Sequence, residues 1–211
     1  MTLGWLLHYL SGRCPRAVRV VSWGVAFVFV AEMLCLVSQA ARGTTSHFNV
    51  ATAYDGAVFG LMGVLIIINT LLVFAVLVLF CLHDYELSPA YLWGIRFGLL
   101  LFLTASLEGA VMISHMAHTV GAPDGGPGLP FVNWSTRAGD LRVAHFLGFH
   151  ALQLLPLAGY ALDQRGATLP RSRRVAYLCA AALAYAAIFS LLFWQAAAGR
   201  PLVPLGFGFA L

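Results

Sequence analysis

The chain has 211 residues, of which 61% are hydrophobic and only 9% are charged. A soluble globular domain carries roughly a quarter charged residues, and so few charges could not cover a water-exposed surface of this size. The composition therefore predicts an integral membrane protein whose main partner is the lipid bilayer. The net charge of +4 is small and no arginine-rich stretch alternates with aromatic residues, so we expect no nucleic-acid binding.

Five apolar stretches are long enough to cross a bilayer, which takes about 20 helical residues. The first ten residues are too short to do so and predict an interfacial segment. We therefore expect an all-α fold, a single transmembrane domain over residues 1–211 with five transmembrane helices. The predicted spans are Ala17–Ala41, Ala57–Leu82, Ala90–His118, Leu141–Leu162 and Val175–Ala198.

Arginine placement predicts the orientation of the bundle. Basic residues gather before the first span and between the fourth and fifth, and the positive-inside rule makes both segments cytoplasmic. The N-terminus is then cytoplasmic and the C-terminus lies outside. All basic residues are arginine, a bias typical of a GC-rich bacterium, which favours the bacterial inner membrane. The two clusters are Arg13, Arg16 and Arg19, and Arg165, Arg171, Arg173 and Arg174.

An alternative for the first span is a cleaved signal peptide that ends near Ser38-Gln39-Ala40. Such a peptide has an apolar region of 7–15 residues. The run before Ser38 is longer than that, and Glu32 interrupts it. We therefore favour a retained transmembrane helix.

The segment between the third and fourth spans, Thr119–Asp140, is rich in glycine and proline. This composition predicts turns and irregular backbone in place of helix or regular strand. Phe131, Val132 and Trp134 favour packing onto the bundle or the headgroup layer over disorder. We therefore expect an ordered extracytoplasmic loop.

Two further features have simple structural interpretations. The four cysteines form no C-x-x-C pair and are expected to be small packing residues. The short polar segment 83–86 is expected to be a solvated turn. The cysteines are Cys14, Cys35, Cys81 and Cys179.

Ionisable side chains within spans are costly in lipid, and each is a candidate functional residue. At a rise of 1.5 Å per residue, Glu32, Glu108 and His150 lie about 14–15 Å below the outer ends of their predicted helices. Three histidines lie about 0–6 Å below them. Six ionisable groups on three helices therefore share the outer half of the bilayer. They are Glu32, Glu108, His115, His118, His145 and His150.

Helical geometry groups some of these residues on one face. Glu108 and His115 are seven residues apart and within roughly 20° of each other on a helix. His145 and His150 are about 140° apart, so they cannot both face one small centre. Asp140 stands where a carboxylate caps the fourth span, and Arg142 is expected to extend toward the headgroups.

Histidines from neighbouring helices at matching depth are what an axially ligated haem b requires, with arginines near its propionates. We predict a haem b or a transition metal (iron, copper or zinc), serving electron transfer or redox sensing, with a redox partner or a second copy as possible partners. His115 and His150 form the inner ligand pair, with Glu108 and Glu32 around it. His118 and His145 form a shallower pair. Arg137 and Arg142 are the predicted cofactor-binding arginines.

Two other functions use the same residues. In a small transporter or proton-coupled channel subunit, Glu32 and Glu108 would relay protons and the glycine-rich loop would gate entry. In a membrane-embedded metal-dependent hydrolase, the histidines would hold a catalytic metal. Interhelical hydrogen bonding without further function is the structural alternative.

A segment from Glu108 to Leu157 resembles one found in uncharacterised bacterial polytopic inner-membrane proteins. The resemblance implies a bacterial inner membrane and no particular activity. Membrane hydrolases that resemble ceramidases place two histidines four apart, whereas His145 and His150 are five apart. The residues that carry the resemblance are Gly128-Leu129-Pro130, Asn133-Trp134-Ser135-Thr136, Gly139-Asp140-Leu141-Arg142, Ala144-His145-Phe146 and His150.

Overall fold

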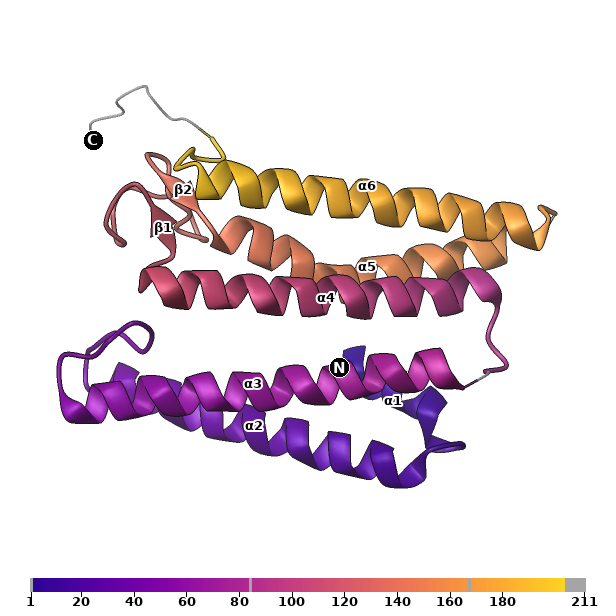
Figure 1. Ribbon diagram of the computed structural model, residues 1–211, viewed down its shortest axis with the longest axis horizontal. Helices are drawn as coiled ribbons and strands as arrows, with labels where there is room; N and C mark the ends of the chain where they lie inside the picture. The colour runs from indigo at the N-terminus through magenta and orange to yellow at the C-terminus, as the bar shows by residue number, and fades with distance from the viewer. Residues whose placement is uncertain (1, 84, 167, 204–211) are drawn as a thin grey trace. The chain divides into compact units, whose positions relative to one another are not determined.

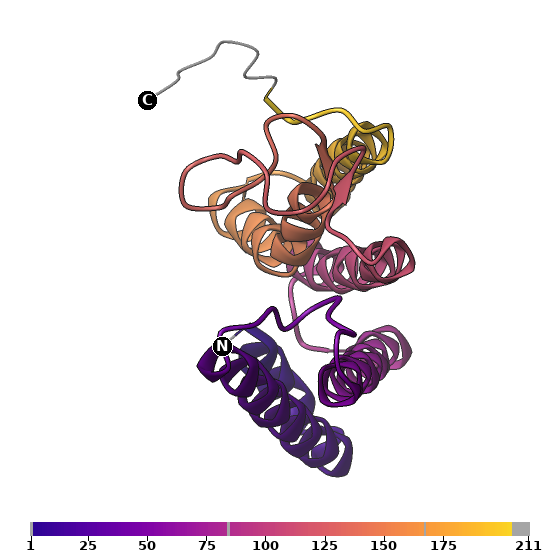
Figure 2. The same ribbon diagram turned by 90° about the vertical axis from the view of Figure 1, so that its left-hand side faces the viewer.

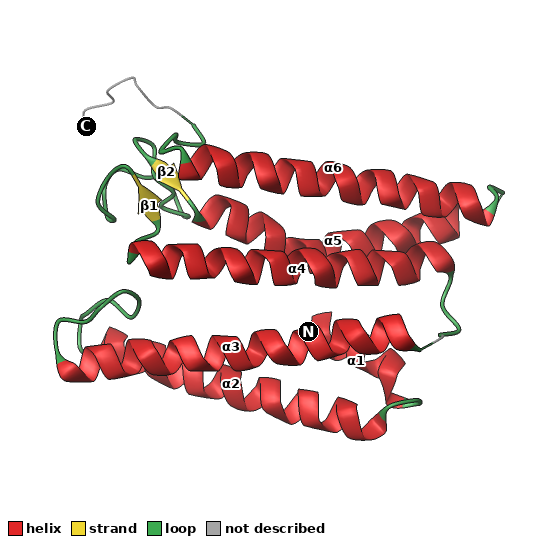
Figure 3. Ribbon diagram, in the orientation of Figure 1, coloured by secondary structure: helices red, strands yellow, loops and turns green. Residues whose placement is uncertain are grey.

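The computed structural model describes residues 2–83, 85–166 and 168–203. These residues form six helices and two short strands, which confirms the predicted all-α class (Figure 3). The chain divides into two compact units, residues 1–86 and 87–211.

The first unit contains α1 (Thr2–Ser11), α2 (Pro15–Ala41) and α3 (Ala53–Leu82). The predicted interfacial segment is α1, which contacts α2 and α3 and buries Leu6 and Leu10 completely. Pro15 begins α2, where its missing N–H leaves no helical hydrogen bond unmade. Thr52 caps α3 by accepting a 3.1 Å hydrogen bond from the Asp55 N–H.

The second unit contains α4 (Pro89–His115), α5 (Arg142–Arg165) and α6 (Arg171–Ala197). The three helices alternate in direction, and α5 packs against both neighbours, most extensively against α4 (Figures 1 and 2). α4 ends three residues before the predicted boundary, because Met116 adopts a left-handed conformation with φ 51°. The prediction that His118 lies on a helix is therefore wrong, and His118 belongs to the loop.

The glycine-rich segment starts and ends in strands β1 (Thr119–Val120) and β2 (Gly139–Asp140). They pair antiparallel, with Thr119 opposite Asp140 (Figure 1). The expectation that this segment contains no regular strand is therefore wrong at its two ends. Gly139 allows β2 to lie close to α6, because a Cβ there would collide with the Ala196 carbonyl group. The interior of the segment is turns and irregular backbone, as the composition predicts.

Within the described residues, four helices, α2, α3, α4 and α6, are long and apolar enough to cross a membrane. Their outward faces carry large apolar side chains that no part of their own unit covers. Trp23 on α2 is 74% exposed and Leu183 on α6 is 72% exposed. Lipid is the environment in which such faces are stable, and these helices support a membrane protein. The fifth predicted span forms α5, which is less apolar and falls outside this group.

Candidate functional site in the second unit

Close packing of α4 against α5 positions the candidate site. A Cβ added to Gly98 of α4 would lie 2.8 Å from the Ala151 carbonyl oxygen of α5, and Gly94 and Gly159 also face backbone of the opposite helix. Small residues allow this approach, as is common between membrane helices. Pro156 lies buried in α5, where it lacks the N–H of a regular helical turn. The α4–α5 pair is therefore a tight contact between two backbones.

Glu108 of α4 and His145 of α5 face each other across this contact. The His145 Nδ1 atom lies 3.7 Å from Glu108 Oε2, and the Glu108 side chain is 3% exposed. Both carboxyl oxygens and Nδ1 are buried, and within the described part of the chain they have no hydrogen-bond partner. Leaving a buried polar group unsatisfied costs about 1–3 kcal/mol. Such groups call for an explanation, such as a bound water, an ion or a chemical role.

The surroundings of this pair are apolar. The His145 ring lies 4.2 Å from the Phe149 ring, and Phe149 stacks on Phe102 of α4 at 4.6 Å between centroids. A Cβ on Gly109 would be 3.4 Å from the His145 Cε1 atom, so the absence of a side chain there makes room for the imidazole. An apolar pocket strengthens the electrostatic interaction between the two groups.

His118 lies above the helices, in contact with Asp124 of the loop. The Asp124 carboxylate accepts hydrogen bonds from the His118 N–H at 3.0 Å, the Thr119 N–H at 2.9 Å and the Thr119 hydroxyl at 2.7 Å. The His118 Nδ1 atom lies 2.8 Å from it. Partial burial acts to raise the pKa of Asp124, but these hydrogen bonds outweigh it and lower the pKa to about 2.

Arg142 is paired with Asp140 at the start of α5. Its Nε and Nη2 atoms donate to the two Asp140 carboxylate oxygens at 2.9 and 2.7 Å, and Nη2 also donates to the Asn133 carbonyl oxygen. Asp140 in turn accepts the Ser135 and Arg142 backbone N–H groups. This ion pair ties the loop to α5. Arg137, the other predicted propionate partner, is exposed in the loop.

The remaining predicted site residues are dispersed. His115 is exposed as the last residue of α4. His150 is exposed on α5, and its Nδ1 atom lies 2.7 Å from the Phe146 carbonyl oxygen. Glu32 is half-buried on α2 in the other unit. Among the described residues, no three His, Cys, Asp or Glu side chains are grouped so that they could hold a metal ion.

The sequence analysis did not predict two polar clusters. Asp163 at the end of α5 accepts the Tyr91 N–H of α4 at 2.9 Å and a hydrogen bond from Arg174 of α6 at 2.7 Å. In the first unit, Asp55 is 3% exposed and bonded to Arg42. The first cluster joins three helices and the second joins α2 to α3. The remaining side chains that bond to Asp55 are Gln39 and Thr52.

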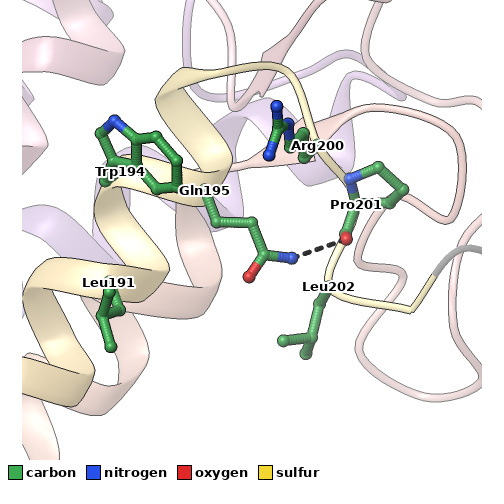
Figure 4. Close-up of a pocket in the computed structure, with 6 residues that line it drawn as sticks. All are labelled: Leu191, Trp194, Gln195, Arg200, Pro201 and Leu202. Atoms are coloured by element: carbon green, nitrogen blue, oxygen red, sulfur yellow. Dashed lines mark hydrogen bonds between the residues drawn. The ribbon is translucent and has the colours of Figure 1, made fainter.

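A surface hollow of about 590 Å³ lies at the C-terminal end of α6 (Figure 4). The Gln195 Nε2 atom donates to the Pro201 carbonyl oxygen at 2.7 Å, and the Arg200 guanidinium lies 5.7 Å from the Trp194 ring centroid. Tryptophan and arginine at a helix end are typical of a membrane–water boundary. The described lining includes no acidic or histidine side chain, so the candidate site is the Glu108–His145 pair. The lining residues are Leu191, Trp194, Gln195, Arg200, Pro201 and Leu202.

Comparisons with protein-family models, with curated proteins and with solved structures found no match to the chain.

Proposed function

We propose that the chain crosses a bacterial inner membrane five times and that its Glu108–His145 pair binds and releases a proton inside the bundle, as part of a small proton-coupled transporter or channel subunit. The observation that carries the proposal is the burial of the Glu108 carboxyl group and of the His145 Nδ1 atom, 3.7 Å apart, without another hydrogen-bond partner in the described residues.

Packing supports a fifth crossing by α5. Its neighbours α4 and α6 are both long and apolar enough to span, and α5 contacts both. The charges near its two ends are paired, Arg142 with Asp140 and Asp163 with Arg174. Pairing reduces the cost of charged groups near lipid. With five crossings, the arginine clusters place the N-terminus in the cytoplasm and the loop 119–140 outside.

A buried carboxyl and an imidazole in contact make a natural proton-binding pair. With one proton between them the pair is neutral overall, whether the proton lies on the carboxyl or on the imidazole. When the pair gains or loses a proton, it carries one net charge in apolar surroundings. That charged state is high in free energy unless the proton is transferred to or from another group. Buried Glu and His residues in membrane bundles commonly serve as proton relays for this reason.

Reconstituted vesicles test the proposal. With an imposed membrane potential and a pH-sensitive dye inside, we expect the protein to accelerate proton entry over empty vesicles. Glu108→Gln and His145→Gln should each reduce that entry by at least tenfold. Glu86→Gln is the matched control, because Glu86 is an exposed acid outside the helices. Equal rates in the wild type and Glu108→Gln, or in the wild type and empty vesicles, would refute the proposal.

A second candidate, a haem b or transition-metal site, is supported by the orientation of His150. A carbonyl oxygen only accepts hydrogen bonds, so the contact with Phe146 requires a proton on Nδ1. This arrangement fixes the tautomer in which Nε2 can bind a metal, and it is common in metal-binding histidines. Purified protein would distinguish the candidates: a haem absorption spectrum, or stoichiometric iron, copper or zinc lost in His150→Ala, would favour this one.

A further inference from the structure

In the first unit, the start of α2 and the end of α3 lie at the same end of the helix pair (Figure 1). A polar contact joins the residue before α2 to the residue after α3. The Cys14 Sγ atom lies 3.7 Å from the His83 Nε2 atom. The His83 Nδ1 atom lies 3.2 Å from the Leu79 carbonyl oxygen. Because a carbonyl oxygen only accepts, Nδ1 carries the hydrogen, and the lone pair of neutral Nε2 faces the thiol.

This geometry is that of a nucleophile beside a base that a third group orients. Cys14 is the thiol, His83 is the base, and the Leu79 carbonyl fixes the ring. Neither residue was singled out by its sequence pattern, because the two are 69 positions apart. The expectation that Cys14 is a simple packing residue does not account for the imidazole placed against it.

The surroundings of Cys14 are also electropositive. Cys14 immediately precedes α2, so its sulfur lies near the positive end of the helix dipole. Arg13 and Arg16 flank it and are both exposed. Cys14 itself is half-exposed, so small reagents can reach it. Electropositive, partly exposed sites of this kind are where reactive cysteines occur.

We propose that Cys14 is a nucleophilic thiol activated by His83, and that it undergoes reversible exchange with low-molecular-weight disulfides. The S–H proton passes to His83 Nε2, and the thiolate attacks one sulfur of the disulfide. The reagent's S–S bond breaks as the mixed disulfide forms, and the departing thiolate takes the proton from His83. Cys14 is oxidised and the released half of the disulfide is reduced, so electrons and protons balance.

The test compares Cys14 with Cys81, which is exposed on α3 and close to His83 in sequence. Each would be kept as the single cysteine, with the other three replaced by alanine. The probe is 4,4′-dithiodipyridine, whose released thiopyridone absorbs light, and the protein is kept in mild detergent. Second-order rates of the two proteins are compared at about pH 7.

We expect Cys14 to react at least roughly tenfold faster than Cys81, because His83 accepts the proton of the Cys14 thiol as it attacks. His83→Gln should reduce the rate of Cys14 to about that of Cys81, with His83→Asn as a second variant if the first does not fold. Equal rates for Cys14 and Cys81, or a Cys14 rate unchanged by both His83 variants, would overturn the proposal. Glutathione disulfide should add one glutathione to wild-type protein, detected by intact mass and removed by dithiothreitol; Cys14→Ser should abolish that adduct.

Discussion

Replacing Asp140 by asparagine tests how firmly the loop is fixed to the second unit. The Asp140 side chain is 1% exposed and accepts hydrogen bonds from the Arg142 Nε and Nη2 atoms, together with the Ser135 N–H at 2.8 Å. Asparagine has nearly the same shape, but it carries no charge and places an NH₂ group where one carboxylate oxygen accepts hydrogen bonds. The variant therefore removes the ion pair and sets donor against donor.

The expected cost follows from burial on each side of the pair. Removing one partner of a fully buried ion pair costs about 3–5 kcal/mol. The Arg142 side chain is 31% exposed and keeps its bond to the Asn133 carbonyl oxygen, so water and that carbonyl partly compensate the charge. We therefore expect Asp140→Asn to reduce the free energy of unfolding by about 2–3 kcal/mol.

Denaturant unfolding in detergent, followed by circular dichroism, would measure this loss. The control is Glu86→Gln, an exposed carboxylate outside the helices, which should cost less. Combining Asp140→Asn with Arg142→Gln should cost less than the sum of the two single losses by about 1–2 kcal/mol, because each removes the same interaction. Additive losses, or a cost for Asp140→Asn below about 0.5 kcal/mol, would refute this reasoning.

Two further predictions concern packing and pH. Gly98→Ala should lower the free energy of unfolding by about 1–3 kcal/mol, because its Cβ would lie 2.8 Å from the Ala151 carbonyl oxygen. Gly63 has open space around it, so Gly63→Ala should be neutral or stabilising. The melting temperatures of the two variants test this difference. The hydrogen bonds to Asp124 lower its pKa from 3.8 to about 2, so their stabilisation is complete above about pH 4 and is lost as pH falls toward 2. Pepsin should therefore cut the loop of the wild-type protein faster at about pH 2 than at about pH 4. In Asp124→Asn the loop should be cut quickly at both pH values. Equal rates for the wild-type protein at the two pH values would contradict this prediction.

Apolar run length predicted the helices well, because a bilayer sets a minimum length. The helices α2 to α6 all lie within about four residues of their predicted bounds. The three-residue difference at the end of α4 arises because Met116, which is not a glycine, adopts the left-handed conformation, so the usual stop signal is absent. The short β1–β2 pairing was missed for a related reason: Thr119 and Asp140 pair across 21 positions, and no local pattern reports such a contact.

The sequence predicted the residues of the candidate site, but it did not predict which of them contact one another. Glu108 was grouped with His115 because the two are seven apart, yet Glu108 is buried and His115 is exposed. Interhelical register decides this, and register depends on where Gly98 and other small residues let the helices approach. The Asp55 cluster had a local signal, since Thr52 three residues earlier forms an N-cap pattern. The ion pair between Asp163 and Arg174 has no local sequence signal, because the two residues lie on different helices.

The most direct test of the Glu108–His145 proposal is infrared difference spectroscopy of the purified protein as the pH is changed. We predict a carboxyl C=O band that appears and disappears with pH, is absent in Glu108→Gln, and titrates at a different pH in His145→Gln. Identical difference spectra for the wild type and Glu108→Gln would contradict the claim that this pair exchanges a proton.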